Sequence, residues 1–77
     1  SFQDFKHDLL PILRRYADRT PGARVEEKTS ALVWHYRNVP TELAYTRRAG
    51  LKRELALVIN KNEIGIFNGN KIIEKRG

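Results

Sequence analysis

Two neighbouring segments, residues 24–28 and 31–37, restrict this chain to folds that contain a β-sheet with two unlike faces. Successive side chains of a strand point to opposite sides of the sheet. As strands, these segments would direct Leu32, Trp34 and Tyr36 to one side. The other side would carry Glu26, Lys28, Val33, His35 and Arg37. We therefore expect one buried face and one face that suits a polyhydroxylated or anionic ligand.

The length of 77 residues indicates one small domain with a limited core. Cysteine is absent, which excludes disulfides and thiolate metal sites and fits a reducing compartment. His7 and His35 lack the spacing of a zinc site. Because the sequence has no apolar run of membrane-spanning length and no secretion signal, we expect a cytoplasmic domain with no membrane partner.

The first helix is expected from Phe2 to Ala17, where apolar residues recur at intervals of three and four. Pro11 lies inside this segment and predicts either a kink or a regular helix that is confined to residues 11–17. The Thr20-Pro21-Gly22 sequence then ends the helical segment.

A second helix is expected after Pro40, capped by Thr41 or Asn38. Its apolar stripe consists of Leu51, Leu55, Val58 and Ile59. A strand over residues 55–60 is the alternative reading. We favour the helix because Lys61-Asn62 provides a plausible helix end.

Residues 64–68 and 71–76 predict a second strand pair, in addition to the pair that is joined near Thr29-Ser30. Asn68-Gly69 between two apolar runs is a strong hairpin signal, since both residues tolerate positive φ. The resulting order is αββαββ. We expect an α+β fold in which two helices cover one face of a four-stranded antiparallel sheet. The opposite face would be open to solvent or to another domain.

These segments also resemble a known family. Residues 20–28 read TPGARVEEK, residues 32–38 read LVWHYRN, and residues 69–74 read GNKIIE. In this order they are similar to the cap domain of trehalose-6-phosphate phosphatases, which are haloacid dehalogenase-like hydrolases. The resemblance covers nearly the whole chain, and the P-G-x-x-V-E-x-K…H-Y-R combination is more specific than any of its parts.

The resemblance implies a phosphatase of trehalose biosynthesis that hydrolyses trehalose 6-phosphate. In this family, a Rossmann-like core holds a D-x-D motif and Mg²⁺, and the cap closes over the core and grips the sugar. The only aspartates of this chain are Asp4, Asp8 and Asp18, and no D-x-D is present. We therefore expect residues 1–77 to be a cap without the catalytic core, inactive alone and binding no Mg²⁺ itself. Its expected partners are trehalose 6-phosphate and the core domain of the same polypeptide.

The first set of substrate contacts that the resemblance implies lies in residues 24–37. Glu26 and Lys28 match the family's E-x-K and would hydrogen-bond sugar hydroxyls. Arg37 matches the arginine of H-Y-R and would lie near the sugar or phosphate, with His35 as a further contact.

The second set lies in residues 69–74. Glu74 matches the glutamate at the end of the last cap strand. Many relatives carry lysine directly after the glycine, where this chain has Asn70 followed by Lys71, so both are candidate contacts. If Glu74 faces the ligand, strand alternation places Ile72 and Asn70 on its side.

Several residues have a structural reading that competes with binding. The polar residues of 24–37 could form cross-strand ion pairs, which contribute roughly 0.2–1 kcal/mol each. We expect Trp34 in the core, Tyr16 and Tyr45 packed on helix faces, and His7 at the surface. The pairs Arg47-Arg48 and Lys52-Arg53 are expected on a solvated helix face, with contact to a core domain or to a partner subunit as the alternative.

The basic composition leaves two other function classes open. Fifteen Lys and Arg against 9 Asp and Glu give a formal net charge of +6, which permits a nucleic-acid-binding module. However, we find no RNP-like aromatic motif, G-x-x-G loop or glycine–lysine run. A protein-interaction domain that docks through its open sheet face is the third class.

Overall fold

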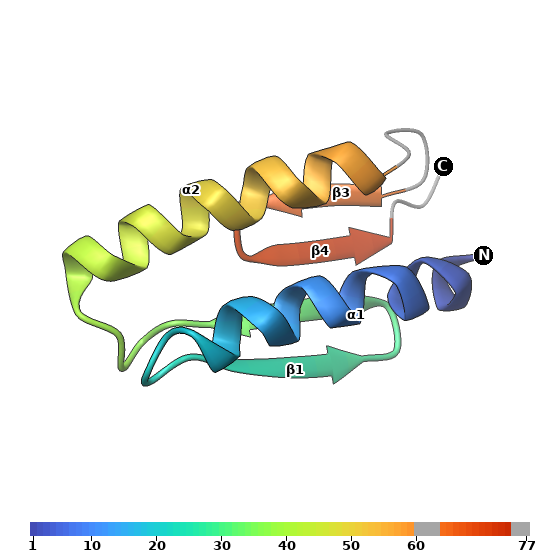
Figure 1. Cartoon of the computed structure of the whole chain (residues 1–77). Helices are drawn as coiled ribbons and strands as arrows, with labels where there is room; N and C mark the ends of the chain where they lie inside the picture. The colour runs from blue at the N-terminus through green and yellow to red at the C-terminus, as the bar shows by residue number, and fades with distance from the viewer. Residues whose placement is uncertain (60–63, 75–77) are drawn as a thin grey trace.

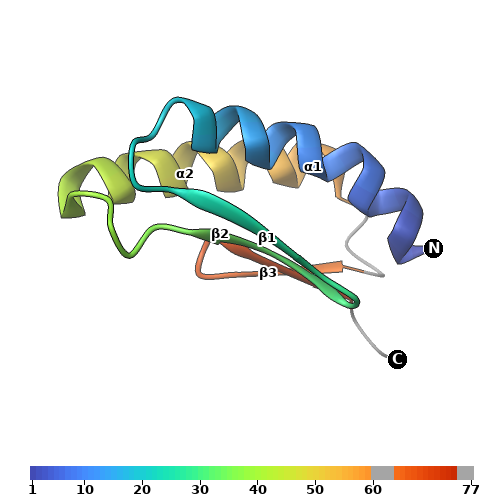
Figure 2. The ribbon, with the colours of Figure 1, turned by 90° about the horizontal axis from the view of Figure 1, so that it is seen from below.

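The computed structural model describes residues 1–59 and 64–74 and contains six elements in the expected order. The bounds are α1 (Phe2–Asp18), β1 (Arg24–Lys28), β2 (Ala31–His35), α2 (Thr41–Val58), β3 (Ile64–Phe67) and β4 (Lys71–Glu74). Both helices lie against one face of an antiparallel sheet with strand order β1-β2-β4-β3 (Figures 1 and 2). This confirms the expected α+β fold, and Figure 2 shows that no element covers the other face of the sheet among the residues described.

Local sequence explains the two hairpins. Asn68 and Gly69 have φ angles of 55° and 72°, the left-handed values of the two central residues of a turn that Asn70 N closes by donating to the Phe67 carbonyl (3.1 Å). The first hairpin pairs β1 with β2 through the Thr29–Ser30 turn. The hairpins join between β2 and β4, where Leu32 lies opposite Ile72 and both side chains are fully buried.

The core fills the space between the helices and the covered face of the sheet. Its largest fully buried side chain belongs to Trp34, as expected. Around it lie Leu9, Leu13, Leu32, Leu51, Leu55 and Ile72, all at 0% exposure. Pro11 stays inside α1 without ending it, and its ring is on the exposed side of the helix.

The ends of β2 and α2 differ from the expectation. The strand β2 ends at His35, because a turn in which Val39 donates to the Tyr36 carbonyl (3.0 Å) takes over there. The N-cap of α2 is Pro40, so neither expected capping residue caps this helix. α2 runs to Val58, which excludes the alternative strand over residues 55–58.

Two expected features fall partly or wholly beyond residues 1–59 and 64–74. The Lys61-Asn62 helix end lies outside the described residues, and the described part of α2 ends with Ile59 at its C-cap. The expected last strand continued to Arg76, but residues 75–77 are also outside the described part. Within the described ranges, no helix has the combination of length and hydropathy that a membrane span requires.

Candidate functional site

The register of the sheet defines an open face, the side that α1 and α2 do not cover. Directly paired residues share a face, so Glu26, Val33 and Lys71 form one row across β1, β2 and β4. The neighbouring rows bring Lys28 and His35 to the same face. This face therefore combines carboxylate, ammonium and imidazole groups around the small apolar side chains of β2.

Glu26 and His35 form a close pair on the open face. His35 Nε2 lies 2.6 Å from Glu26 Oε1, and both side chains are half-buried. The hydrogen bond from His35 lowers the pKa of Glu26, and the positive charges of Lys28 and Arg24 lower it further. Glu26 is therefore an ionised acceptor at neutral pH, the state that can accept hydrogen bonds from ligand hydroxyls.

The side chain of Lys6 holds the end of β1 from the covered side. Lys6 is only 5% exposed, and its ammonium group donates to the carbonyl of Lys28. The same group lies 3.7 Å from the carboxylate of Glu27, whose position in the register is on the covered side. This contact fixes the backbone of the Glu26–Lys28 segment and leaves the side chain of Lys28 exposed on the open face.

Arg37 lies beyond β2, in the turn that leads to α2. β2 ends at His35, so the expectation that the strand continues to Arg37 is wrong, and the Arg37 side chain is exposed. It lines a hollow of about 220 Å³ together with Tyr36, Val39, Thr41, Ala44, Tyr45 and Arg48. Arg37 is thus placed at the end of the sheet rather than in a row of the open face.

The second hairpin separates the two candidates Asn70 and Lys71. Lys71 pairs with Val33 and therefore lies on the open face with Glu26. The side-chain amide of Asn70 donates to the Trp34 carbonyl (3.2 Å), and its backbone carbonyl accepts from Trp34 N (2.8 Å). The Asn70 amide is thus engaged with β2, so Lys71 is the better placed of the two to contact a ligand on the open face.

Glu74 does not share the face of Glu26 within β4. It lies two positions after Ile72 and therefore on the same side of β4, and Ile72 is fully buried under the helices. Glu74 itself is half-buried and lies opposite the buried Ile64. The register therefore brings Glu26, Lys28, His35 and Lys71 together, and leaves Glu74 at the covered side of the β4 end.

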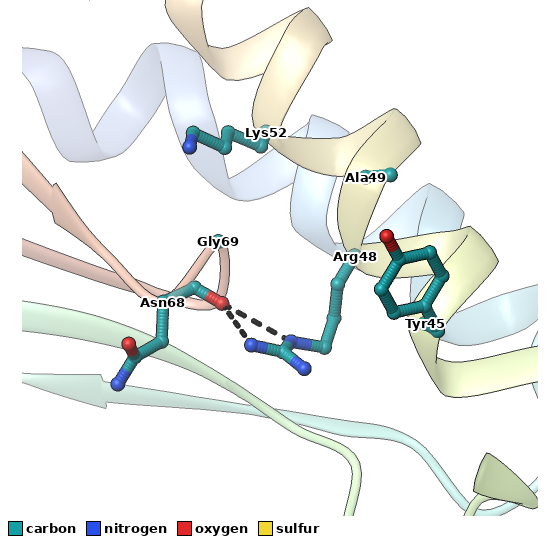
Figure 3. A pocket seen from close by; sticks show the side chains of 6 residues that line it. All are labelled: Tyr45, Arg48, Ala49, Lys52, Asn68 and Gly69. Carbon is teal, nitrogen blue, oxygen red and sulfur yellow. Dashed lines mark hydrogen bonds between the residues drawn. The ribbon is translucent and has the colours of Figure 1, made fainter. Parts of the chain in front are cut away.

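The expectations for Tyr45, Arg47 and Arg48 of α2 were wrong. Tyr45 does not pack on the helix face, because 74% of its surface is exposed. Arg47 and Arg48 are not simply solvated. Arg47 Nε donates to Thr20 Oγ1 (3.1 Å), and Arg48 Nε donates to the Asn68 carbonyl (3.1 Å; Figure 3).

The sequence contained a signal for the role of Arg48. It follows Ala44 by four residues and precedes Leu51 by three, and both of these are buried. Positions separated by three or four residues lie on the same side of a helix. Arg48 therefore belongs to the flank of the buried stripe, where a long side chain can reach the sheet.

The Mg²⁺ that the resemblance implies would belong to a core domain outside this chain, and no candidate ligand set for a metal is present in the part of the chain that is described. There, no three His, Asp or Glu side chains lie close enough to hold a metal ion. The polar groups of the open face mix positive and negative charges, which suits hydroxyls and anions better than a divalent cation. We therefore assign no step to a metal in this domain.

Comparisons with known proteins agree with the fold and the motif. A family model for trehalose-phosphatase matches residues 1–77. An alpha,alpha-trehalose-phosphate synthase [UDP-forming] B of Dictyostelium discoideum is 36% identical over 91% of this chain and 9% of its own length. A trehalose-phosphatase of Zygosaccharomyces rouxii is 35% identical over 84% of this chain and 7% of its own length.

The fold also matches solved structures. The C-terminal domain of C. albicans trehalose-6-phosphate phosphatase superposes with a TM-score of 0.82, at 24% identity, over 92% of this chain and 26% of that one. An Aspergillus fumigatus trehalose-6-phosphate phosphatase superposes with a TM-score of 0.71, at 23% identity, over 96% of this chain and 29% of that one. The chain thus spans less than a tenth of these curated relatives and about a quarter of these structures. By its full-length match to the family model, the chain belongs to the trehalose-phosphatase family.

Proposed function

We propose that this chain is the substrate-gripping cap of a trehalose-6-phosphate phosphatase in trehalose biosynthesis. The observation that carries the proposal is the open sheet face with its Glu26–His35 pair and the exposed Lys28. The family membership supports the substrate class, because relatives of this chain are trehalose-phosphatases. The nucleic-acid and protein-interaction alternatives gain no support from these relatives.

The chemistry of the open face suits a phosphorylated disaccharide. Such a ligand presents many hydroxyls, and each buried polar group left unpaired costs about 1–3 kcal/mol. The ionised Glu26 would accept hydrogen bonds from hydroxyls, whereas Lys28 and Lys71 would donate them. Because these groups stand on paired strands, the sheet holds them at fixed spacings.

Arg37 would contact the sugar phosphate from the end of the sheet. Its guanidinium offers paired donors that match phosphate or adjacent hydroxyl oxygens. The exposed position in the turn after β2 leaves this group free to approach a ligand that lies along the open face. Asn70 lies just before β4 and Glu74 lies at its end, so a ligand contact would require an approach from beyond the ends of this strand, and we assign them a secondary part in binding.

The hydrolytic step would belong to a core domain outside this chain. That core would hold the nucleophilic aspartate and Mg²⁺, and the metal would screen the charge of the phosphoryl group. The cap would close over it, exclude water and orient the sugar. We therefore propose that residues 1–77 have no phosphatase activity alone. We also propose that the protein acts in the cytoplasm.

The test uses the longer polypeptide that carries this chain. Substitutions Glu26→Ala, Lys28→Ala and Arg37→Ala should each reduce kcat/KM for trehalose 6-phosphate by about tenfold or more, the effect of losing a charged hydrogen bond. Hydrolysis of p-nitrophenyl phosphate, which has no sugar to grip, should change much less. Arg53→Ala is the matched control, since Arg53 is exposed on α2. Equal losses on both substrates would assign these residues to folding or closure and would contradict the proposal.

A further inference from the structure

We infer that Arg48 of α2 is a positioning residue, which holds both the Tyr36–Arg37 turn and the Asn68–Gly69 hairpin tip in place for sugar-phosphate binding. This inference rests on the proposed function, because it assigns Arg48 an effect on the residues of that site. Arg48 would act through its neighbours and not by touching the substrate.

The first contact is with the aromatic ring of Tyr36. The guanidinium carbon of Arg48 lies 4.5 Å from the centroid of this ring, a distance typical of a cation–π interaction. The Tyr36 ring also stacks on the buried Trp34, with centroids 6.3 Å apart and planes inclined by 23°. Tyr36 is thus held between the core and α2, and this restricts the backbone on which the next residue, Arg37, stands.

The second contact is with the tip of the β3–β4 hairpin. Arg48 Nε donates to the carbonyl oxygen of Asn68 at 3.1 Å, and Arg48 Nη2 donates to the same oxygen (Figure 3). Two donors of one rigid guanidinium fix the direction of the contact, which a flexible lysine ammonium would not do. On the other side, Asn70 is bound to Trp34 through its amide and its backbone. The tip is therefore held from both α2 and β2, and Lys71 follows directly after it.

The surroundings of Arg48 agree with this role. It lines the 220 Å³ hollow beside Arg37 and a second hollow of about 290 Å³ that Tyr45, Ala49, Lys52, Asn68 and Gly69 complete (Figure 3). Within residues 1–59 and 64–74, no carboxylate lies within 4.0 Å of its guanidinium. In this part of the structure, the donors of Arg48 therefore serve a backbone carbonyl and a ring, and do not form an ion pair.

Loss of Arg48 should affect one half of the proposed site and spare the other. Glu26 and Lys28 stand on β1, whose end is held by Lys6 from α1. Arg37 and Lys71 stand on the two segments that Arg48 joins. We therefore expect weaker sugar-phosphate binding, without a change in the hydrolytic step itself.

The experiment compares Arg48→Met and Arg48→Lys in the longer polypeptide. Arg48→Met should raise KM for trehalose 6-phosphate about tenfold, with kcat nearly unchanged, because a misplaced binding group weakens binding by this order. Arg48→Lys keeps the charge but lacks the paired donors, so its KM should lie between that of the Arg48→Met variant and that of the unsubstituted protein. The matched control is Arg53→Met, and p-nitrophenyl phosphate hydrolysis should be unaffected by all three substitutions.

A double variant separates positioning from general stability. In an Arg37→Ala background, adding Arg48→Met should raise KM by much less than tenfold, because part of its effect passes through Arg37.

Thermal unfolding identifies folded variants, and if Arg48→Met does not fold, Arg48→Lys decides the question. Folded Arg48 variants with unchanged KM, or with equal losses on both substrates, would overturn the inference. If Glu26→Ala still impaired hydrolysis of trehalose 6-phosphate but not of p-nitrophenyl phosphate, the proposed function would stand. If substitution of neither Glu26 nor Arg48 selectively impaired hydrolysis of trehalose 6-phosphate, the proposed function itself would fail.

Discussion

His35 Nε2 lies 2.6 Å from Glu26 Oε1, and the two residues stand on neighbouring strands of the open face. The pair is diagonal, since His35 lies directly opposite Arg24 and Glu26 lies opposite Val33. The hydrogen bond therefore connects two rows of the open face. It keeps the Glu26 carboxylate oriented and ionised before any ligand arrives.

This relationship predicts a pH dependence of stability. The pKa of Glu26 in the folded chain is lowered from the ordinary glutamate value, chiefly by the His35 hydrogen bond. Its stabilising contribution is thus fully present above the unfolded pKa and is lost as the pH falls through the folded pKa. The melting temperature of the chain should exceed that of Glu26→Gln at pH 6, and the difference should shrink by pH 3. A difference that stays constant across this range would contradict the assignment.

The two turn glycines should respond to alanine in a definite order. Gly22 and Gly69 both have positive φ, 94° and 72°, where a Cβ atom costs roughly 1–2 kcal/mol. At Gly22 the added Cβ would also overlap the Asn38 carbonyl, whose carbon would be 2.8 Å away. At Gly69 the nearest atom would be the Arg48 carbonyl oxygen at 3.4 Å. Urea unfolding should therefore show a larger loss of stability for Gly22→Ala than for Gly69→Ala, and the reverse order would refute this explanation.

The buried ammonium group of Lys6 should be important for stability. Lys6→Met retains most of the buried side-chain volume but removes the donor to the Lys28 carbonyl. Leaving a polar group without its partner costs about 1–3 kcal/mol in the free energy of unfolding. The exposed Lys52 provides the control, for which Lys52→Met should change this free energy by about 0.5 kcal/mol or less. Similar values for the two variants in urea unfolding would mean that the Lys6 contact is not stabilising.

Two leucines on the last turns of α2 should differ sharply. Leu55 is fully buried, whereas Leu57 is 87% exposed. Leu55→Ala should reduce the free energy of unfolding by about 2–5 kcal/mol, through lost burial and the cavity left behind. Leu57→Ala should have an effect of about 0.5 kcal/mol or less, because it removes few contacts. Comparable losses in calorimetry would indicate that α2 packs on the sheet with a different side.

Local sequence was sufficient for the order and type of the elements. The alternation around Glu26 and Trp34 determined two strands with unlike faces, because neighbouring strand side chains cannot point the same way. Asn68-Gly69 determined the second hairpin through its tolerance of positive φ. The P-G-x-x-V-E-x-K…H-Y-R pattern indicated the family that the full-length match then confirmed.

Long-range contacts decided which candidate residues come together. The pairing of Val33 with Lys71 put Lys71 on the open face, and no local pattern could choose between Lys71 and Asn70. The turn after His35 moved Arg37 out of the strand, because a turn hydrogen bond replaced further pairing of β2 there.

The sequence by itself therefore determined a two-layer α+β domain, its polar face and its family. Only the tertiary structure decided that Lys6 holds β1 and that Arg48 joins two loops, since both residues read locally as helix-surface cations. The physical reason is reach. A lysine or arginine side chain here reaches partners that are 22 positions away in the chain, from Lys6 to Lys28, or 20 positions away, from Arg48 to Asn68. Such partners are set by the packing of the helices on the sheet, so helix periodicity can place Arg48 beside the buried stripe but cannot identify the group that it contacts.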